Sequence, residues 1–343
     1  MRHSYDPAGH DHALRSAVQD LRAHRWSGAR DLMEITSGPA WAQRTYRSQV
    51  LAAAAAESTV IDSWATEDPT SYTALLLRAR VAVHRALRAA RIGDPQAWQW
   101  EEQARRFSLK AAHAWADDPV PWVCLLALAQ LDVHCERPEH RERPAEVMLP
   151  RGPWKLLDEA HRRDPFNREA YHRALQFVRS IRPPAYDFGS WIASHAPAGS
   201  PLHLLPLYAS VQQKNLQESN AAWRYEWSQE GAQHTIQQAY HWWFLPNADR
   251  RTQCVVEDLS HLALSLWASR QFEQANRVFT AMTPYAAPEP WRTVAGGNEH
   301  EAARLLEQAR VEAQNIARGR EGHQAPPSRP ARGFNRLFGG SSA

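Results

Sequence analysis

Histidine and cysteine side chains come together at two places where their types could form a metal site. His134, Cys135 and His140 are close in sequence, and Gly9–His12 carries two histidines around one aspartate. Structural zinc sites use such ligands at characteristic spacings, which neither group matches. We interpret the first group as the packed end of a helix and Asp11 as the N-cap of the first helix. No metal or other cofactor is expected.

Motifs for nucleophilic, metal-dependent and phosphate-transfer chemistry are absent from the sequence, which contains no G-x-x-x-x-G-K-[ST], H-E-x-x-H or G-x-S-x-G. Cys124 lies in the apolar stretch Trp122–Leu128, where a buried thiol is unreactive. The 17 histidines are dispersed along the chain, so that a chance pairing with an aspartate carries no information. These features favour a non-enzymatic protein. An all-helical enzyme with a cavity lined by Trp and His is the less favoured alternative.

The chain has 15 tryptophans, and aromatic residues are densest in 223–227 and 240–244. Neighbouring residues of a helix point about 100° apart, so these side chains cannot all belong to one core-facing stripe. Either these helices are buried on several sides, or part of each lines a groove in which a partner docks through aromatic and arginine anchors. The candidate groove residues are Trp191, Trp223, Arg224, Trp227 and Trp242.

The segments that must position these residues have the periodicity of amphipathic helices. Apolar residues recur every three to four positions, and we find no alternating pattern typical of a strand. The sequence therefore predicts an all-α protein. The clearest predicted helices are 72–91, 96–115, 121–133, 154–161, 168–178, 254–269 and 301–317.

Internal repetition is the most informative feature of the sequence. Asp-Pro recurs at Asp68, Asp118 and Asp164, each time with apolar residues seven and eleven positions later. The recurrence of the Asp-Pro pair is explained if the aspartate caps a helix and the proline lies in the first turn of that helix. The two ends of the chain are also similar, because Ala17–Met33 aligns at one constant offset with Ala263–Phe279. The sequence therefore predicts repeated helix–turn–helix units.

The spacing Leu259-x2-Leu262-Ala263-x2-Leu266-x5-Phe272-x2-Ala275-x3-Phe279, with Pro288 beyond it, resembles the tetratricopeptide repeat. Met282 departs from the pattern, because the family has Ala at that position of the second helix. The resemblance implies an α-solenoid of stacked antiparallel helix pairs, a right-handed superhelix over residues 10–318 with degenerate repeats. It also implies that a peptide or helix binds in the concave surface.

Three segments fall outside this pattern. Residues 1–9 are expected to be a flexible N-terminus, and the proline-rich polar loop 136–153 is expected to be exposed and could separate two halves of the solenoid. Residues 319–343 are rich in Pro, Gly and Ser and are expected to form a disordered, basic tail. This tail contains a short motif with three large apolar residues at helical spacing, through which a partner could be bound: Arg332, Phe334, Arg336, Leu337 and Phe338.

Charge and composition limit the classes of partner. The chain has a net charge of +3, and most of the surplus lies in the tail, so that we expect no direct nucleic-acid binding by the folded part. No apolar run is long enough for a transmembrane segment and no signal peptide is recognisable, although the tail could touch a membrane surface weakly. Three widely spaced cysteines fit a reducing cytoplasm. Arginine outnumbers lysine 37 to 3, as in GC-rich genomes such as those of actinobacteria.

The sequence thus favours a cytoplasmic scaffold or adaptor that binds one protein or peptide partner in the concave groove and a second partner through the tail motif. A helical regulatory protein controlled by a peptide or small ligand is the alternative from another class.

Overall fold

The computed structural model describes residues 4–36, 38, 40–144, 149–181, 185–213 and 220–324, without the side chains of 212–223 and 320–324. Within these ranges the chain is helical and contains no β-strand; the only β-type pairings are two isolated bridges, Ser4 with Tyr285 and Glu142 with Gly152. None of the helices in the described ranges combines the length and the apolar character needed to cross a membrane. The predicted all-α fold is confirmed.

The α-helices follow the predicted segments closely. The first half contains α1 (His12–Arg22), α2 (Ser27–Glu34), α3 (Trp41–Ala55), α4 (Val60–Glu67), α5 (Tyr72–Arg91), α6 (Ala97–Ala114), α7 (Val120–Leu128), α8 (Trp154–Arg163) and α9 (Arg168–Ser180). The second half contains α10 (Ala185–His195), α11 (Leu205–Gln213), α12 (Asn220–Trp227), α13 (Glu230–Ala239), α14 (Val256–Ala268), α15 (Phe272–Met282), α16 (Trp291–Val294) and α17 (Glu299–Gln324). Short 3-10 or π turns lie at Ala129–Leu131, Pro138–His140, Pro201–Leu204, Tyr240–Phe244 and Ala248–Gln253.

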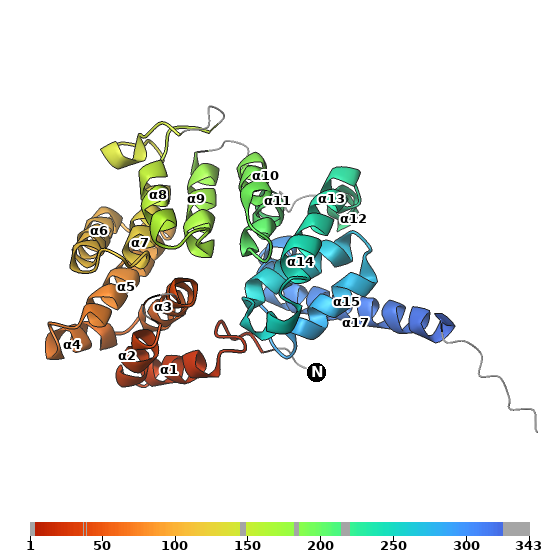
Figure 1. The fold of residues 1–343 in the computed structure, drawn as a ribbon, viewed down its shortest axis with the longest axis horizontal. Helices are drawn as coiled ribbons and strands as arrows, with labels where there is room; N and C mark the ends of the chain where they lie inside the picture. The colour runs from red at the N-terminus through yellow and green to blue at the C-terminus, as the bar shows by residue number, and fades with distance from the viewer. Residues whose placement is uncertain are drawn as a thin grey trace, which may run out of the picture.

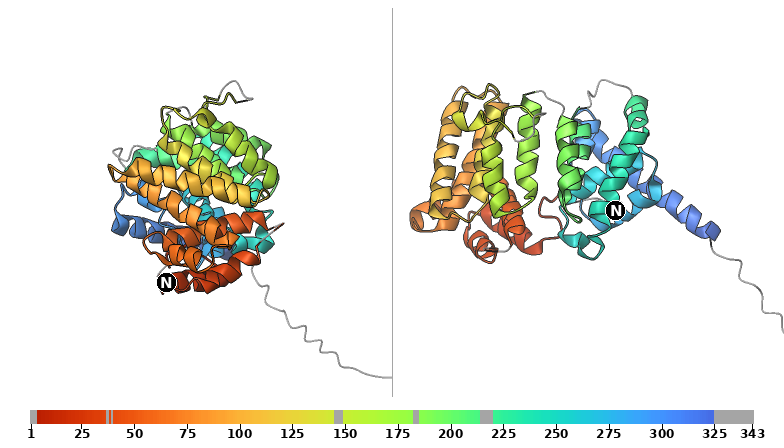
Figure 2. Two further views of the ribbon diagram at one scale, coloured as in Figure 1. Left: turned by 90° about the vertical axis from the view of Figure 1, so that its left-hand side faces the viewer. Right: turned by 45° about the horizontal axis from the view of Figure 1, so that its top comes forward.

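Helices that follow one another in the chain also pack against one another. α5 lies against α6, α6 against α7, and α7 against α8 and α9. In Figure 1 α4–α6 lie at one end of the molecule and α12–α17 lie towards the other, α1–α3 lie along the bottom, and α17 projects beyond the body. Figure 2 shows the helices from α5 to α10 standing side by side.

Two hydrophobic clusters form the interior, and α7 belongs to both. Its Cys124 and Leu128 pack in the cluster formed by the N-terminal helices, whereas its Val123 and Leu126 pack in the cluster formed by the C-terminal helices. Only Trp122 of this helix is not fully buried. The boundary between the cores therefore runs through α7 and not through loop 136–153, where the sequence placed a possible border. That loop is also less exposed than expected, because His140 is buried and bonds Asp132 through Nδ1 at 2.8 Å.

The first described residues are packed and do not form the flexible N-terminus expected over 1–9. Ser4 exchanges two backbone hydrogen bonds with the 284–286 segment, both 3.1 Å long, and Ala8 is fully buried. We call Ser4–Asp11 the N-terminal strap. It joins α1 to the C-terminal half, and no local pattern in the sequence indicates it because its partners lie about 280 residues away.

Of the three Asp-Pro pairs, one aspartate bonds the start of the following helix as predicted, and the other two do not cap their helices. Asp118 accepts the Val120 N–H at 2.8 Å at the start of α7, as expected. Before α5 and α9 the caps are instead Ser71 and Asn167, three residues after the aspartates, and Asp164 bonds the Asn167 side chain. The expected cap of α1 is confirmed, since the Asp11 side chain accepts the Leu14 N–H.

The two regions that align at a constant offset turn in the same way. His24 after α1 and Arg270 after α14 both have left-handed backbone conformations, with φ of 59° and 63°. In both turns the next residue donates its N–H to the carbonyl five positions earlier, Arg25 to Asp20 and Gln271 to Leu266, each at 2.8 Å. A second helix follows each turn, α2 in one case and α15 in the other.

Candidate functional site

A cleft of about 840 Å³ lies where the two halves of the molecule meet. One wall is the N-terminal strap with the outward face of α3, and the opposite wall is the segment Asn247–Asp258 that leads into α14. The first residues of α9, Asn167–Glu169, form its floor. Four segments that are far apart in sequence thus surround one space.

A buried ion pair fixes the corner of the cleft between α9 and α14. Arg168 holds Asp258 with two hydrogen bonds of 2.7 and 2.6 Å, from Nε and Nη2. Tyr208 of α11 donates its hydroxyl to Asp258 at 2.6 Å and stacks on His261, with ring centroids 3.6 Å apart. Burial raises the pKa of the Tyr208 hydroxyl far above its ordinary range, so that it remains a donor. Side chains of α9, α11 and α14 thus meet at this corner.

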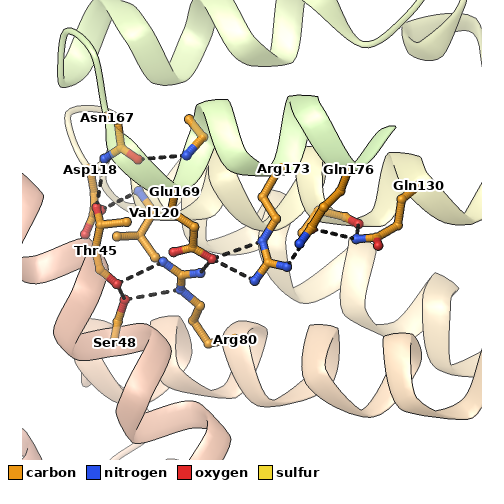
Figure 3. Close-up of polar contacts among 12 residues, drawn as sticks. Thr45, Ser48, Arg80, Asp118, Val120, Gln130, Asn167, Glu169, Arg173 and Gln176 are labelled. Atoms are coloured by element: carbon orange, nitrogen blue, oxygen red, sulfur yellow. Dashed lines mark hydrogen bonds and ion pairs between the residues drawn. The ribbon is translucent and has the colours of Figure 1, made fainter. Parts of the chain in front are cut away.

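A second network fixes α9 to α3 and α5 below the floor (Figure 3). Arg80 of α5 bonds Glu169 at 2.8 Å, the Ser48 hydroxyl at 3.2 Å and the Thr45 carbonyl at 3.2 Å. Arg173 reaches the same Glu169 oxygen, with bonds of 2.9 and 3.2 Å. Although burial opposes ionisation, the two guanidinium groups hold the pKa of Glu169 at about 2. Its charge is thus balanced within the protein.

The space is lined by apolar, charged and uncharged polar residues. Gln43, Gln49, Thr252 and Gln253 line the cleft, and none of these side chains is hydrogen-bonded to another part of the described chain. Asn247 uses its amide nitrogen to bond the Gly199 and Trp243 carbonyls, at 3.0 and 2.7 Å. Primary amides both donate and accept hydrogen bonds. Amide and hydroxyl groups therefore form part of the surface of the cleft, beside apolar residues such as Ala42 and Val255.

The predicted groove residues whose side chains are described do not line this cleft. Trp227 is 2% exposed and lies in the C-terminal core, so it cannot dock a partner at the surface; the aromatic density of α12 reflects burial here. Trp191 and Trp242 are partly exposed, at 36% and 53%. Trp191 contacts His195 on its own helix, and Trp242 stacks on His203.

The other two groove residues lie on α12. The Arg224 guanidinium is 3.8 Å from the centre of the Trp267 ring, and burial lowers its pKa. Trp223 is within α12, but its side chain lies outside the described residues. The tail motif, Arg332, Phe334, Arg336, Leu337 and Phe338, is also outside the described residues.

The cleft was missed because its residues come from four distant segments. Its strongest signal in the sequence was an arginine in a mainly apolar helical stretch, Arg80 in 74–83; Arg44 and Arg47 of α3 lie among polar residues and give no such signal. Buried arginines need carboxylate partners, so they indicate internal polar networks. The pattern does not indicate which segments provide those partners.

Of the residues first considered for metal or thiol chemistry, Cys124 is fully buried, which raises the pKa of its thiol to about 11. Among the residues whose placement is described, no three His, Cys, Asp or Glu side chains are grouped so that they could hold a metal ion. The three cysteines are unpaired.

Comparison with known proteins found no matching family model, no similar curated protein and no similar solved structure.

Proposed function

We propose that this chain is a non-enzymatic interaction protein, a scaffold or adaptor, and that its cleft binds an extended polypeptide segment of a partner. The observation that carries the proposal is the lining of the cleft, in which Gln43, Gln49 and Gln253 present unbonded amides from both walls. Every residue of an extended peptide except proline presents one N–H and one C=O. Glutamine side chains can bond both groups whatever the peptide sequence.

The charges of the cleft also suit a backbone ligand. Arg47 pairs with Asp11, Arg168 pairs with Asp258, and Glu169 pairs with two arginines. These charges are already matched, so they do not select a strongly charged ligand; the exposed Arg250, which also lines the cleft, has no ion pair with a residue that the structure describes. Tyr46 and Trp243 add apolar surface for side chains of the bound segment.

For the fold, we propose a tetratricopeptide-like right-handed superhelix with degenerate repeats. The matching turns at His24 and Arg270, together with the packing of consecutive helices, support this proposal. A partner that binds the tail motif as a second site remains part of the proposed scaffold. The unpaired cysteines are consistent with a reducing cytoplasm.

A ligand-controlled regulatory protein is the second candidate function. The volume of the cleft, about 840 Å³, falls within the range of about 300–1,000 Å³ typical of small-molecule sites. A compact ligand bound between the two halves would restrict their relative motion. This candidate predicts binding of a small molecule in place of a peptide.

Selection of a displayed random-peptide library on the full chain tests the first candidate. The variants Gln49→Leu and Gln253→Leu should weaken the selected peptides about fivefold each, because each variant removes hydrogen bonds worth about 1 kcal/mol. Gln99→Leu, at an exposed position of α6 outside the cleft, is the matched control. Peptides that bind wild type and both cleft variants equally well would rule out this site.

A further inference from the structure

We propose that the N-terminal strap is a latch that closes one side of the cleft and that Arg15 holds it shut. The latch is a property of the fold, so it goes beyond the proposed function and does not depend on what the cleft binds. Ala8–Asp11 of the strap and Cys254–Val256 line the same space. Displacement of the strap would therefore open the cleft along its length.

Arg15 of α1 connects three parts that meet at the strap. Its Nε bonds Asp6 of the strap at 2.7 Å, and its Nη2 reaches both the Gly9 carbonyl and the Tyr285 hydroxyl, the latter at 2.5 Å. The guanidinium also lies 4.9 Å from the centre of the Tyr285 ring. One side chain of the N-terminal half thus fixes the strap and its docking segment in the C-terminal half.

Gly9 brings the strap against the opposite wall. Its φ is +54°, in the left-handed region that favours glycine, and a Cβ built on it would be 2.6 Å from Cγ2 of Val256. Any side chain at this position would push the strap away from Val256. The contact therefore depends on glycine for two reasons, backbone conformation and space.

Opening of the strap withdraws one of its residues, Ala8, from the N-terminal core. The ends of the strap differ, because Asp11 is held as the cap of α1 and by Arg47, whereas Ser4 is attached by two backbone hydrogen bonds. The Arg15–Asp6 pair is partly exposed, and the strap has no helix or strand of its own. Segments with few buried contacts open locally at a much lower free energy than the whole protein. Asp11 is then the pivot and Ser4 the free end.

The labelling rates of the three cysteines can be used to measure the opening of the cleft. Cys254 lies in the cleft, two residues from the contact with Gly9; Cys135 is half-buried and does not line the cleft; Cys124 is fully buried in α7. Iodoacetamide labelling of the full chain, quantified for each cysteine by mass spectrometry, reports the opening of the cleft, a remote surface and the core separately. When opening and closing are fast, the labelling rate follows the population of the open form.

Arg15→Ala and Gly9→Ala should each raise the labelling rate of Cys254 about tenfold, with Tyr285→Phe giving a smaller increase. Cys135 and Cys124 should keep their wild-type rates. Gly93→Ala is the matched control for Gly9→Ala, because Gly93 also has a positive φ, +70°, but a Cβ added there would meet no atom within 4 Å. An unchanged Cys254 rate in both Arg15→Ala and Gly9→Ala, or a parallel rise at Cys124, would overturn the latch.

Discussion

Arginine supplies the buried positive charges of this protein. Arg44 and Arg80 are 1% and 3% exposed, and each bonds atoms of more than one helix. The planar guanidinium presents five donors in a fixed arrangement, which lets one side chain bond several acceptors in different directions. Lysine has a single charged nitrogen and cannot reproduce these contacts.

Replacement of Arg80 by lysine should therefore be costly although the charge is conserved. Arg80→Lys should lower the free energy of unfolding by about 2–4 kcal/mol, because it leaves buried acceptors of α3 and α9 without their donors. Urea unfolding monitored by circular dichroism measures this loss. Arg88 lies on the same helix as Arg80 and forms an exposed ion pair with Glu57. Arg88→Lys should change stability by less than about 0.5 kcal/mol. Equal effects of the two substitutions would contradict the assigned role of Arg80.

At the scale of elements, the junction of α9, α11 and α14 depends on neutral histidines. Burial lowers the pKa of His261 to about 4, and burial together with Arg168 lowers the pKa of His172 well below its ordinary range. Tyr208 lies between the two rings, in contact with both. The charged neighbours are Arg168, whose guanidinium disfavours protonation, and the carboxylates of Asp258 and Glu289, which favour it.

These depressed pKa values predict that the protein loses stability in mild acid. In the unfolded chain these two histidines bind protons below about pH 6.5, whereas in the folded chain His261 binds one only at about pH 4, so stability falls as the pH decreases between these values. His261 alone accounts for about 3 kcal/mol over this range. Urea midpoints at pH 7.5, 6 and 5 measure the loss, and His261→Phe should reduce its slope. A wild-type midpoint that does not change down to pH 5 would refute this prediction.

Elements were easier to predict from the sequence than the site. Apolar periodicity located α5 and α6 to within one residue, because a helix is determined by neighbours in sequence. The groove was predicted from aromatic density, which cannot distinguish Trp227 in the core from Trp242 at the surface. The cleft was not predicted at all, because the pairing of Arg168 with Asp258 joins residues 90 positions apart. Such partners are selected by tertiary packing and leave no local pattern.

At the scale of the whole molecule, α7 makes the two cores interdependent. Its side chains are divided between the N-terminal and C-terminal clusters, and both clusters lose contacts if the helix moves. The ion pair Arg80–Glu169 links α5, which packs in the N-terminal cluster, to α9, which packs in the C-terminal cluster, and so adds a second connection between the clusters. We expect the described part of the chain to unfold as one unit.

Leu126→Ala tests this coupling, because Leu126 is fully buried in α7. The substitution should cost about 2–5 kcal/mol, as expected for a large-to-small change in a core. Tryptophan fluorescence and far-ultraviolet circular dichroism should still report one coincident urea transition, shifted to lower urea. Two separate transitions, with only one of them shifted, would show that the halves unfold independently.

The docking of Ser4 on Pro284 and Ala286 also determines when the protein can mature during translation. Residues 4–11 are synthesised about 280 residues before the segment on which Ser4 docks. Every nascent chain shorter than this therefore has an unlatched N-terminus, whatever helices it has already formed. A nascent chain that has reached α14 can therefore surround the cleft, but it cannot latch the strap until residues 284–286 have been made.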